Sequence, residues 1–136
     1  MNTTTRQDPT SALTPRRAME AIAHALRTEL GPEDDAALAL TINGLGVHIA
    51  PRRQGGLAAI FRVGAADTVS RQAVVAALAQ SARWARDGLT HRFVVLDGAL
   101  TLAWSPAPVP RARLLDELEE AVVNALAVAA LALRYA

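Results

Sequence analysis

The chain has 136 residues and a mass of 14.4 kDa, which suits a single domain that can bury a core without disulfides. It contains no cysteine, so a disulfide framework and a thiolate metal site are excluded. The formal net charge is +1, and basic residues are adjacent only at Arg16–Arg17 and Arg52–Arg53, so we expect no nucleic-acid partner.

The first 13 residues are mostly polar, which predicts a disordered N-terminal tail over residues 1–13. Residues 14–136 are then expected to form one domain. The tail has no apolar segment of the kind that a secretory signal needs. The longest apolar run, 121–133, is interrupted by Asn124 and is shorter than the roughly 20 residues that cross a bilayer. We therefore expect no membrane span and a cytoplasmic location.

A helix is predicted directly after the tail. Thr14 supplies an N-cap oxygen, and Pro15 suits the first helical position because the N–H that proline lacks would have no partner there. Apolar residues recur at helical spacing from Met19 to Leu30. Gly31–Pro32 is expected to end the helix before an acidic loop.

The hydrophobic period then changes to two residues, which predicts strands. Asn43–Gly44 separates the first two runs and is a strong hairpin signal, because both turn residues must tolerate a positive φ. A polar turn at residues 51–56 precedes the third run. The three runs predict an antiparallel meander with one buried face. Their alternating apolar residues are Leu38, Leu40 and Ile42, then Leu45, Val47 and Ile49, then Leu57, Ala59, Phe61 and Val63.

A second helix, a two-strand hairpin and a third helix complete the expected elements. Asp67 or Ser70 caps the second helix, and Asp97–Gly98 supplies the turn of the hairpin. A proline-rich step at 105–110 cannot pair as a regular strand and leads into the last helix. The expected ranges are 69–86 for the second helix, 92–96 and 99–104 for the strands, and 111–134 for the last helix.

The second and last helices carry more apolar residues than one buried face needs. On the second helix, Val74 and Val75 point in different directions, and so do Trp84 and Ala85. The second half of the last helix is apolar all round. Such a surplus predicts a partner or an oligomer, with a thicker core as the alternative.

No motif for catalysis, metal binding or cofactor binding is visible. His24, His48 and His91 lie on different predicted elements and do not form a metal-ligand pattern. The serines lack the context of a nucleophile elbow, and the absence of lysine excludes a Walker lysine and Schiff-base chemistry. We therefore expect a protein that is not an enzyme and uses no metal or cofactor.

The predicted fold is α+β, with the order α-β-β-β-α-β-β-α. This order, together with the chain length, resembles the class I chaperones of type III secretion. The resemblance covers about 14–135 and rests on the segment 38–49 (LALTINGLGVHI), the segment 93–102 (FVVLDGALTL) and the proline-containing step into the last helix. It implies a twisted antiparallel sheet with three packed helices, and a homodimer that binds secreted effectors in the bacterial cytoplasm.

The resemblance also implies two sets of site residues. Clients of the family bind as extended segments over apolar patches of the first helix and the sheet, and the dimer contact involves the second helix and the strand after it. Carried over, the client-binding residues are Met19, Ile22, Leu26, Val47, Ile49 and Phe61, and the dimer-interface residues are Val74, Leu78, Trp84, Phe93 and Val95.

Two functions are therefore considered. The first is a non-enzymatic homodimeric chaperone that binds an extended segment of a secreted effector. The alternative is a regulatory or scaffold protein of the same fold that binds a folded secretion-system partner. Members of the family are usually acidic, whereas this chain has a sequence pI ≈ 8.5, which implies an acidic client or a regulatory member. The Arg52–Arg53 turn is the place where acidic residues of a client could bind.

Overall fold

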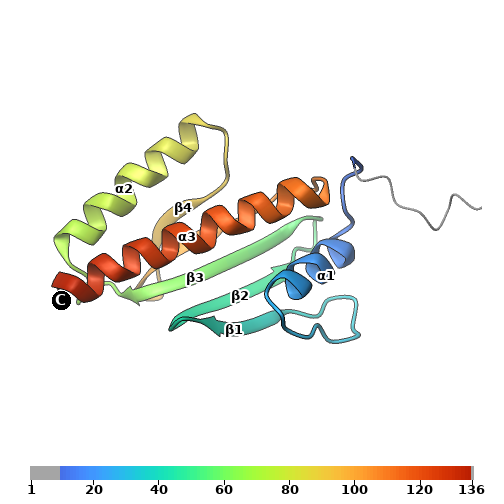
Figure 1. Cartoon of the computed structure of the whole chain (residues 1–136), viewed down its shortest axis with the longest axis horizontal. Coiled ribbons are helices and arrows are strands. Elements are labelled where there is room, and N and C mark those ends of the chain that lie inside the picture. Colours follow the sequence, from blue (N-terminus) through green and yellow to red (C-terminus); the bar gives the residue numbers. More distant parts are fainter. Residues whose placement is uncertain (1–9, 136) are drawn as a thin grey trace, which may run out of the picture.

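The computed structural model describes residues 10–135, and the elements follow the predicted order (Figure 1). Both two-residue turns adopt the expected conformation, with φ values of 49° and 84° at Asn43 and Gly44 and of 51° and 74° at Asp97 and Gly98. The elements are α1 Pro15–Ala25, β1 Leu38–Ile42, β2 Leu45–Pro51, β3 Leu57–Ala65, α2 Arg71–Arg86, β4 Arg92–Leu96, β5 Ala99–Trp104 and α3 Arg111–Tyr135.

The five strands form one antiparallel sheet in the order β1-β2-β3-β5-β4. The meander predicted for the first three strands is confirmed. The hairpin of β4 and β5 joins it through β5, so β1 and β4 are the two edge strands. The pairing of β3 with β5 shifts between Arg62 and Gly64, which marks a β-bulge near the end of β3.

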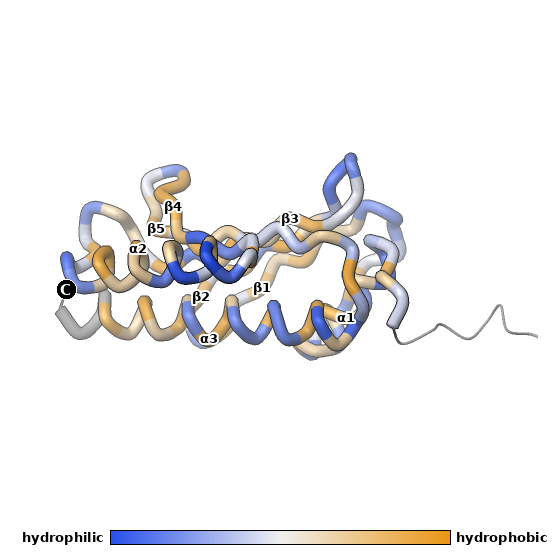
Figure 2. Tube along the Cα trace, turned by 90° about the horizontal axis from the view of Figure 1, so that it is seen from above, coloured by the Kyte–Doolittle hydropathy of each residue, from blue (hydrophilic) through white to orange (hydrophobic). Residues whose placement is uncertain are grey.

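The core lies between the helices and one face of the sheet. The long helix α3 runs across β2, β3 and β5, and α1 packs beside it on β2 (Figures 1 and 2). Helix α2 contacts β4 and α3. The strand register aligns one apolar row beneath the helices, which is the face that the alternation predicted. The row consists of Leu40, Val47, Phe61, Leu102 and Phe93.

Helix α1 begins as predicted but ends five residues before the predicted end. The side chain of Thr14 accepts a hydrogen bond from the Arg17 N–H, and Pro15 is the first helical residue. The helix ends at Ala25, because Arg27 adopts a left-handed φ of 55° and the N–H of Thr28 donates to the Ala23 carbonyl at 2.9 Å. This is a Schellman ending with arginine in the position that glycine usually takes.

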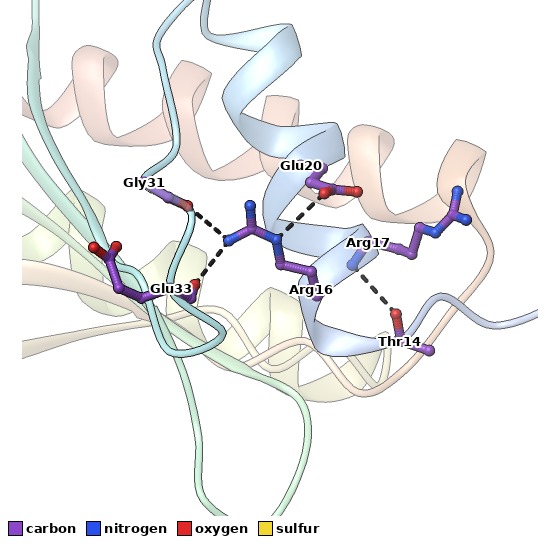
Figure 3. A network of polar contacts seen from close by, with 6 residues as sticks. All are labelled: Thr14, Arg16, Arg17, Glu20, Gly31 and Glu33. Atoms are coloured by element: carbon purple, nitrogen blue, oxygen red, sulfur yellow. Dashed lines mark hydrogen bonds and ion pairs between the residues drawn. The ribbon is translucent and has the colours of Figure 1, made fainter.

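Arg16 fastens the segment between α1 and β1 to the helix (Figure 3). Its Nη1 donates to the carbonyl oxygens of Gly31 at 2.8 Å and Glu33 at 2.9 Å. Its Nε donates to the Glu20 carboxylate at 3.3 Å. The acidic loop that precedes the edge strand β1 is therefore held by main-chain acceptors as well as by an ion pair.

The packed part of the chain begins one residue before the predicted domain boundary. Leu13 is buried, and its N–H donates to the Val109 carbonyl at 3.0 Å. Residues 1–9 of the predicted tail lie outside the described residues. Ser70, rather than Asp67, caps α2, because its hydroxyl accepts the Ala73 N–H at 3.1 Å.

Candidate functional site: two sheet edges and an apolar helix face

The residues predicted to bind a client form the core of the protomer. Ile22, Ile49 and Phe61 are completely buried, and Met19 and Val47 are nearly so. Leu26 packs partly buried at the edge of the same cluster. A client cannot touch the buried five while the protomer is folded, so their interpretation as a binding surface is corrected to core packing. The periodicity located their face, and helices α1 and α3 cover that face.

The residues predicted to form the dimer interface divide into two groups. Trp84 is 1% exposed and Phe93 is also buried, so both belong to the protomer core. The prediction that they contact a second copy directly is therefore wrong. Leu78 is 62% exposed and Val95 is 65% exposed, and Val74 is exposed as well. These three residues are available for contact.

These three exposed residues form one apolar face, which we define by Val74, Leu78 and Val95. Its helical part lies on α2, and its other part lies on the edge strand β4. A pocket of about 180 Å³ between the two elements is lined by side chains of both, including Val74, Leu78 and Val95. Contiguous exposed apolar surface of this kind is typical of an interface.

Helix α2 covers part of the free edge of β4. Leu96 and Ala99 flank the two-residue turn, so they form a hydrogen-bonded pair, and the main-chain groups of Phe93 and Val95 point away from β5. The outward N–H of Phe93 donates to the Ser81 hydroxyl at 2.8 Å, and this hydroxyl donates to the Ala77 carbonyl at 2.9 Å. Ser81 therefore satisfies one position of this edge.

The free edge of β1 has no such cover among the described residues. Ile42 and Leu45 flank the Asn43–Gly44 turn and form a hydrogen-bonded pair, so the N–H and C=O of Ala39 and Thr41 point away from β2. None of these groups takes part in a main-chain hydrogen bond elsewhere in the described chain. An unpaired edge of this kind can accept an added strand.

A shallow hollow lies beside the β1 edge, on the sheet face opposite the helices. Its volume is about 510 Å³, and it lies over β1, β2 and β3. The surface is hollow here because Ala39 on β1 has a small side chain and Gly46 on β2 has none. Thr41, His48, Ile60 and Arg62 also line the hollow.

The rings of Trp84, His91, Phe93 and Trp104 form a buried aromatic cluster. The ring of His91 stacks on Trp104 with centroids 5.5 Å apart, and Trp84 lies 5.2 Å from His91 and 5.6 Å from Phe93. Two glutamates of α3 accept the indole N–H groups: Trp84 donates to Glu120 at 2.9 Å and Trp104 donates to Glu117 at 3.0 Å.

His91 is 2% exposed, and its Nε2 lies 2.8 Å from the Glu117 carbonyl oxygen. Because a carbonyl can only accept, Nε2 carries the proton of the neutral ring and Nδ1 remains an acceptor. Burial lowers the pKa of His91, and the hydrogen bond to Glu117 and the charges of Glu117 and Glu120 oppose this effect only in part. The ring is therefore neutral at neutral pH.

Among the residues that the structure describes, no group of three or more metal-ligating side chains comes together. None of the helices in the described part of the chain is long and apolar enough to cross a membrane. The surfaces available for function are therefore the β1 edge with its hollow, the apolar face and the cavities near them.

Sequence reasoning did not identify the β1 edge or the hollow. Ala39, Thr41 and Gly46 occupy the positions between the apolar residues of the alternating runs, so the pattern marks their face but not its use. The strand order decides which main-chain groups stay free, and that order depends on pairings between distant segments. The Asn43–Gly44 turn was the available signal, because it fixes which residues of β1 point outward.

No protein-family model matches the chain, and no curated protein matches its sequence. Solved structures do match. A structure of the Yersinia pestis type III secretion chaperone SycH with a stable fragment of YscM2 gives a TM-score of 0.57 at 21% identity, covering 85% of this chain and 99% of the other. The ExsC–ExsE complex gives 0.55 at 18% identity, covering 84% and 86%.

The HopA1–SchA chaperone–effector complex gives a TM-score of 0.53 at 14% identity, and the match covers 82% of this chain and 87% of the other. At these identities the likeness is one of fold. The five-stranded antiparallel sheet, the order of its elements and the three packed helices are shared over most of both chains. The chain therefore has the fold of the class I type III secretion chaperones.

Proposed function

We propose that the chain is a non-enzymatic chaperone of bacterial type III secretion that binds an extended segment of a secreted effector in the cytoplasm as a homodimer. The observation that carries this proposal is the free edge of β1 beside the open hollow. The N–H and C=O groups of Ala39 and Thr41 point outward there, and an extended segment is the ligand that such an edge recognises.

The comparisons support the same kind of ligand. SycH is crystallised with a fragment of YscM2, and SchA is part of a chaperone–effector complex. Both proteins share the fold of this chain at low identity. A fold that holds other polypeptides in those proteins, together with a free strand edge in this one, favours a role in holding a polypeptide.

The geometry predicts how the segment binds. A strand that pairs with β1 alternates its side chains between the two faces of the sheet. Side chains on the open face come to lie beside the hollow over Ala39 and Gly46, where the small residues leave room. Side chains on the other face come to lie on the side of the sheet that the helices cover.

The homodimer is proposed from the apolar face on α2 and β4. A face of exposed apolar residues is costly in water, and a twofold contact between identical faces would cover it in both copies at once. The face and the β1 edge lie on opposite edges of the sheet. A dimer formed in this way leaves both client-binding edges free.

The test is capture of the partner from the native host by the wild-type protein and by Thr41→Pro, followed by binding measurements with the isolated N-terminal segment of the captured protein. Proline removes the outward N–H of Thr41 but no ladder hydrogen bond, so the fold should persist. We expect binding at least tenfold weaker, on the order of the loss of one or two main-chain hydrogen bonds in a dry contact.

The matched controls are Thr41→Val, which keeps the N–H and should bind normally, and Leu40→Pro, which breaks the ladder with β2 and should unfold. Circular dichroism checks the fold of each variant. A partner that binds only as a folded protein, and equally well to Thr41→Pro, would reject the extended-segment mechanism in favour of the regulatory alternative.

A further inference from the structure

Gly46 occupies a regular position of β2 that does not require glycine. It pairs with Thr41 on β1 and with Arg62 on β3, and no bulge interrupts either pairing at this position. Its φ is not in the left-handed region. A Cβ atom placed on Gly46 would lie 3.7 Å from the Cβ of Arg62, which is an ordinary contact, and would meet nothing closer. The fold would therefore accept a larger residue here.

A glycine inside a strand lowers stability, because it loses more conformational freedom on folding than other residues. Where neither a bulge nor a positive φ requires it, such a glycine often marks a place that a ligand or another chain approaches closely. Gly46 and Ala39 form the floor of the hollow on the open face of the sheet. In β-sheets, a glycine near an edge is commonly covered by an aromatic side chain from a neighbouring strand.

The protomer does not supply such a ring to the hollow from its described side chains. The aromatic rings that the structure describes are all buried in the core, on Phe61, Trp84, Phe93 and Trp104. The residues that line the hollow are aliphatic or polar apart from the imidazole of His48. The surface over Gly46 is therefore uncovered in the protomer.

The margin of the hollow farthest from the β1 edge is cationic. Arg62 is exposed, lines the hollow and has no hydrogen-bond or ion-pair partner among the described residues. Because Gly46 has no side chain, no β2 side chain stands directly between Arg62 and Thr41. A guanidinium packs favourably on the face of an aromatic ring. An aromatic side chain in the hollow would meet both an apolar floor and this cation.

We infer that the hollow receives an aromatic side chain of the strand that pairs with β1, lying over Ala39 with its outer edge at Gly46. Neighbouring strands lie about 4.8 Å apart, so β2 is the second strand from the added one. A long aromatic side chain can cross the small Ala39 and approach Gly46, whereas a short aliphatic one stops above β1.

The inference rests on the proposed function and deepens it, because it names a side chain that the client must carry. Main-chain pairing with β1 alone reads little sequence. The hollow adds a preference for an aromatic residue at one outward-facing position of the paired segment.

The experiment uses the full chain and capped heptapeptides that differ only at the central position. The probe is acetyl-Ser-Thr-Val-Trp-Val-Thr-Ser-amide, and its controls have Ala or Leu in place of Trp. Binding is followed by NMR through the methyl signal of Ala39 and the Hα signals of Gly46. We expect the Trp peptide to bind about tenfold more tightly than the Ala peptide, as burial of part of an aromatic side chain implies. The ring current should shift both signals in the Trp complex only.

Filling the hollow separates the needs of the fold from those of binding. Gly46→Thr should raise the urea midpoint of unfolding, because it replaces a strand glycine, and should weaken binding of the Trp peptide about tenfold. Ala39→Leu fills the same hollow from β1 and should weaken binding to a similar extent. The matched control is Ala50→Thr, which adds a side chain on the same face of β2 outside the hollow and should leave binding unchanged.

A second pair of variants tests the cation. Arg62→Gln should weaken binding of the Trp peptide about threefold, as loss of an exposed cation–π contact implies. Arg92→Gln removes an exposed arginine of the same sheet face that does not line the hollow, and it should bind like the wild type. Equal losses in these two variants would mean that general charge, rather than contact with the ring, controls binding, and would remove Arg62 from the site.

Equal binding of the Trp and Ala peptides, or wild-type affinity of Gly46→Thr, would overturn the inference. A lower urea midpoint in Gly46→Thr would also overturn it, because Gly46 would then serve the fold. A Leu peptide that binds as tightly as the Trp peptide would make the hollow a general apolar site and reject the aromatic assignment. Peptides that bind equally, and are lost in Thr41→Pro, would leave the proposed function standing. Absence of saturable binding of all three peptides would count against strand addition at β1 and therefore against both.

Discussion

At the scale of single residues, His91 is a buried polar side chain that contacts both tryptophans and helix α3. Its ring lies between Trp84 and Trp104, and Nε2 reaches the main chain of α3. The carboxylates nearby, Glu117 and Glu120, are themselves engaged by the two indole N–H groups. A proton added to the imidazole would therefore enter a site with little water and with partly occupied acceptors.

The lowered pKa of His91 predicts that the free energy of unfolding depends on pH. Its pKa lies below 6.5 in the folded protein, and an unfolded chain has the ordinary value of 6.5. Between the two values the unfolded state binds a proton that the folded state does not, so the free energy of unfolding should fall as the pH falls below 6.5. Above 6.5 the histidine should have no effect on this free energy.

Urea unfolding measured from pH 7.5 down to pH 5 checks this prediction. His91→Gln keeps a donor for the Glu117 carbonyl but cannot titrate, so its stability should depend less on pH than that of the wild type. His48→Gln changes an exposed histidine and should preserve the wild-type dependence. Parallel curves for wild type and His91→Gln would contradict the assignment.

At the scale of elements, the loop before β1 depends on one arginine. Arg16 holds the carbonyls of Gly31 and Glu33 and pairs with Glu20 (Figure 3). Arg16→Ala should lower the free energy of unfolding by about 1 kcal/mol, because the side chain is partly exposed and its hydrogen bonds compete with water.

The clearer readout is local. Amide hydrogen exchange in residues 28–37 should speed up in Arg16→Ala, since the loop loses its attachment to α1. Arg17→Ala removes the neighbouring arginine, whose side chain is exposed, and should leave exchange unchanged. Equal acceleration in both variants would mean that helix charge, rather than the contacts of Arg16, controls the loop.

The elements that sequence reasoning placed well are those with local causes. Asn43–Gly44 and Asp97–Gly98 favour tight turns through their own φ preferences, and the strands beside them follow. The end of α1 has no such signal, because Arg27 occupies a left-handed position that usually belongs to glycine. The helical spacing of Leu26 and Leu30 therefore continued past the true end.

Burial was harder to predict than secondary structure. Alternation shows that Val47 and Phe61 share a face, but it does not show whether a helix or a client covers that face. The same holds for α2, where Trp84 and Leu78 are both apolar and only the packing of α2 against β4 and α3 separates core from surface.

At the scale of the whole molecule, the apolar face predicts a dimer with twice the 14.4 kDa mass of the chain. Leu78→Asp should dissociate it, because the change places an unpaired charge in a contact that excludes water. Leu78 is mostly exposed in the protomer, so the fold should survive. Light scattering at micromolar concentration measures the mass.

Two further substitutions make the test specific. Val123→Asp changes an exposed apolar residue of α3 that lies outside the apolar face, and it should leave the dimer intact. Trp84→Asp places a charge in the protomer core and should unfold the chain rather than dissociate it. A monomer in the wild type, or a dimer that withstands Leu78→Asp, would reject this interface.

The two edges of the sheet differ in how far they are covered, and this difference affects self-association into filaments. A sheet with two open edges can add copies of itself indefinitely, which is the route to fibrous aggregates. Here α2 lies over the start of the β4 edge and Ser81 takes the outward N–H of Phe93, while β1 stays open. An added strand can therefore pair along β1, but it cannot pair along the whole of β4, because the outward N–H of Phe93 is already taken. Growth of a ladder from copy to copy is hindered at the start of β4, so we expect the protein to form long polymers less readily than a sheet with two fully open edges would.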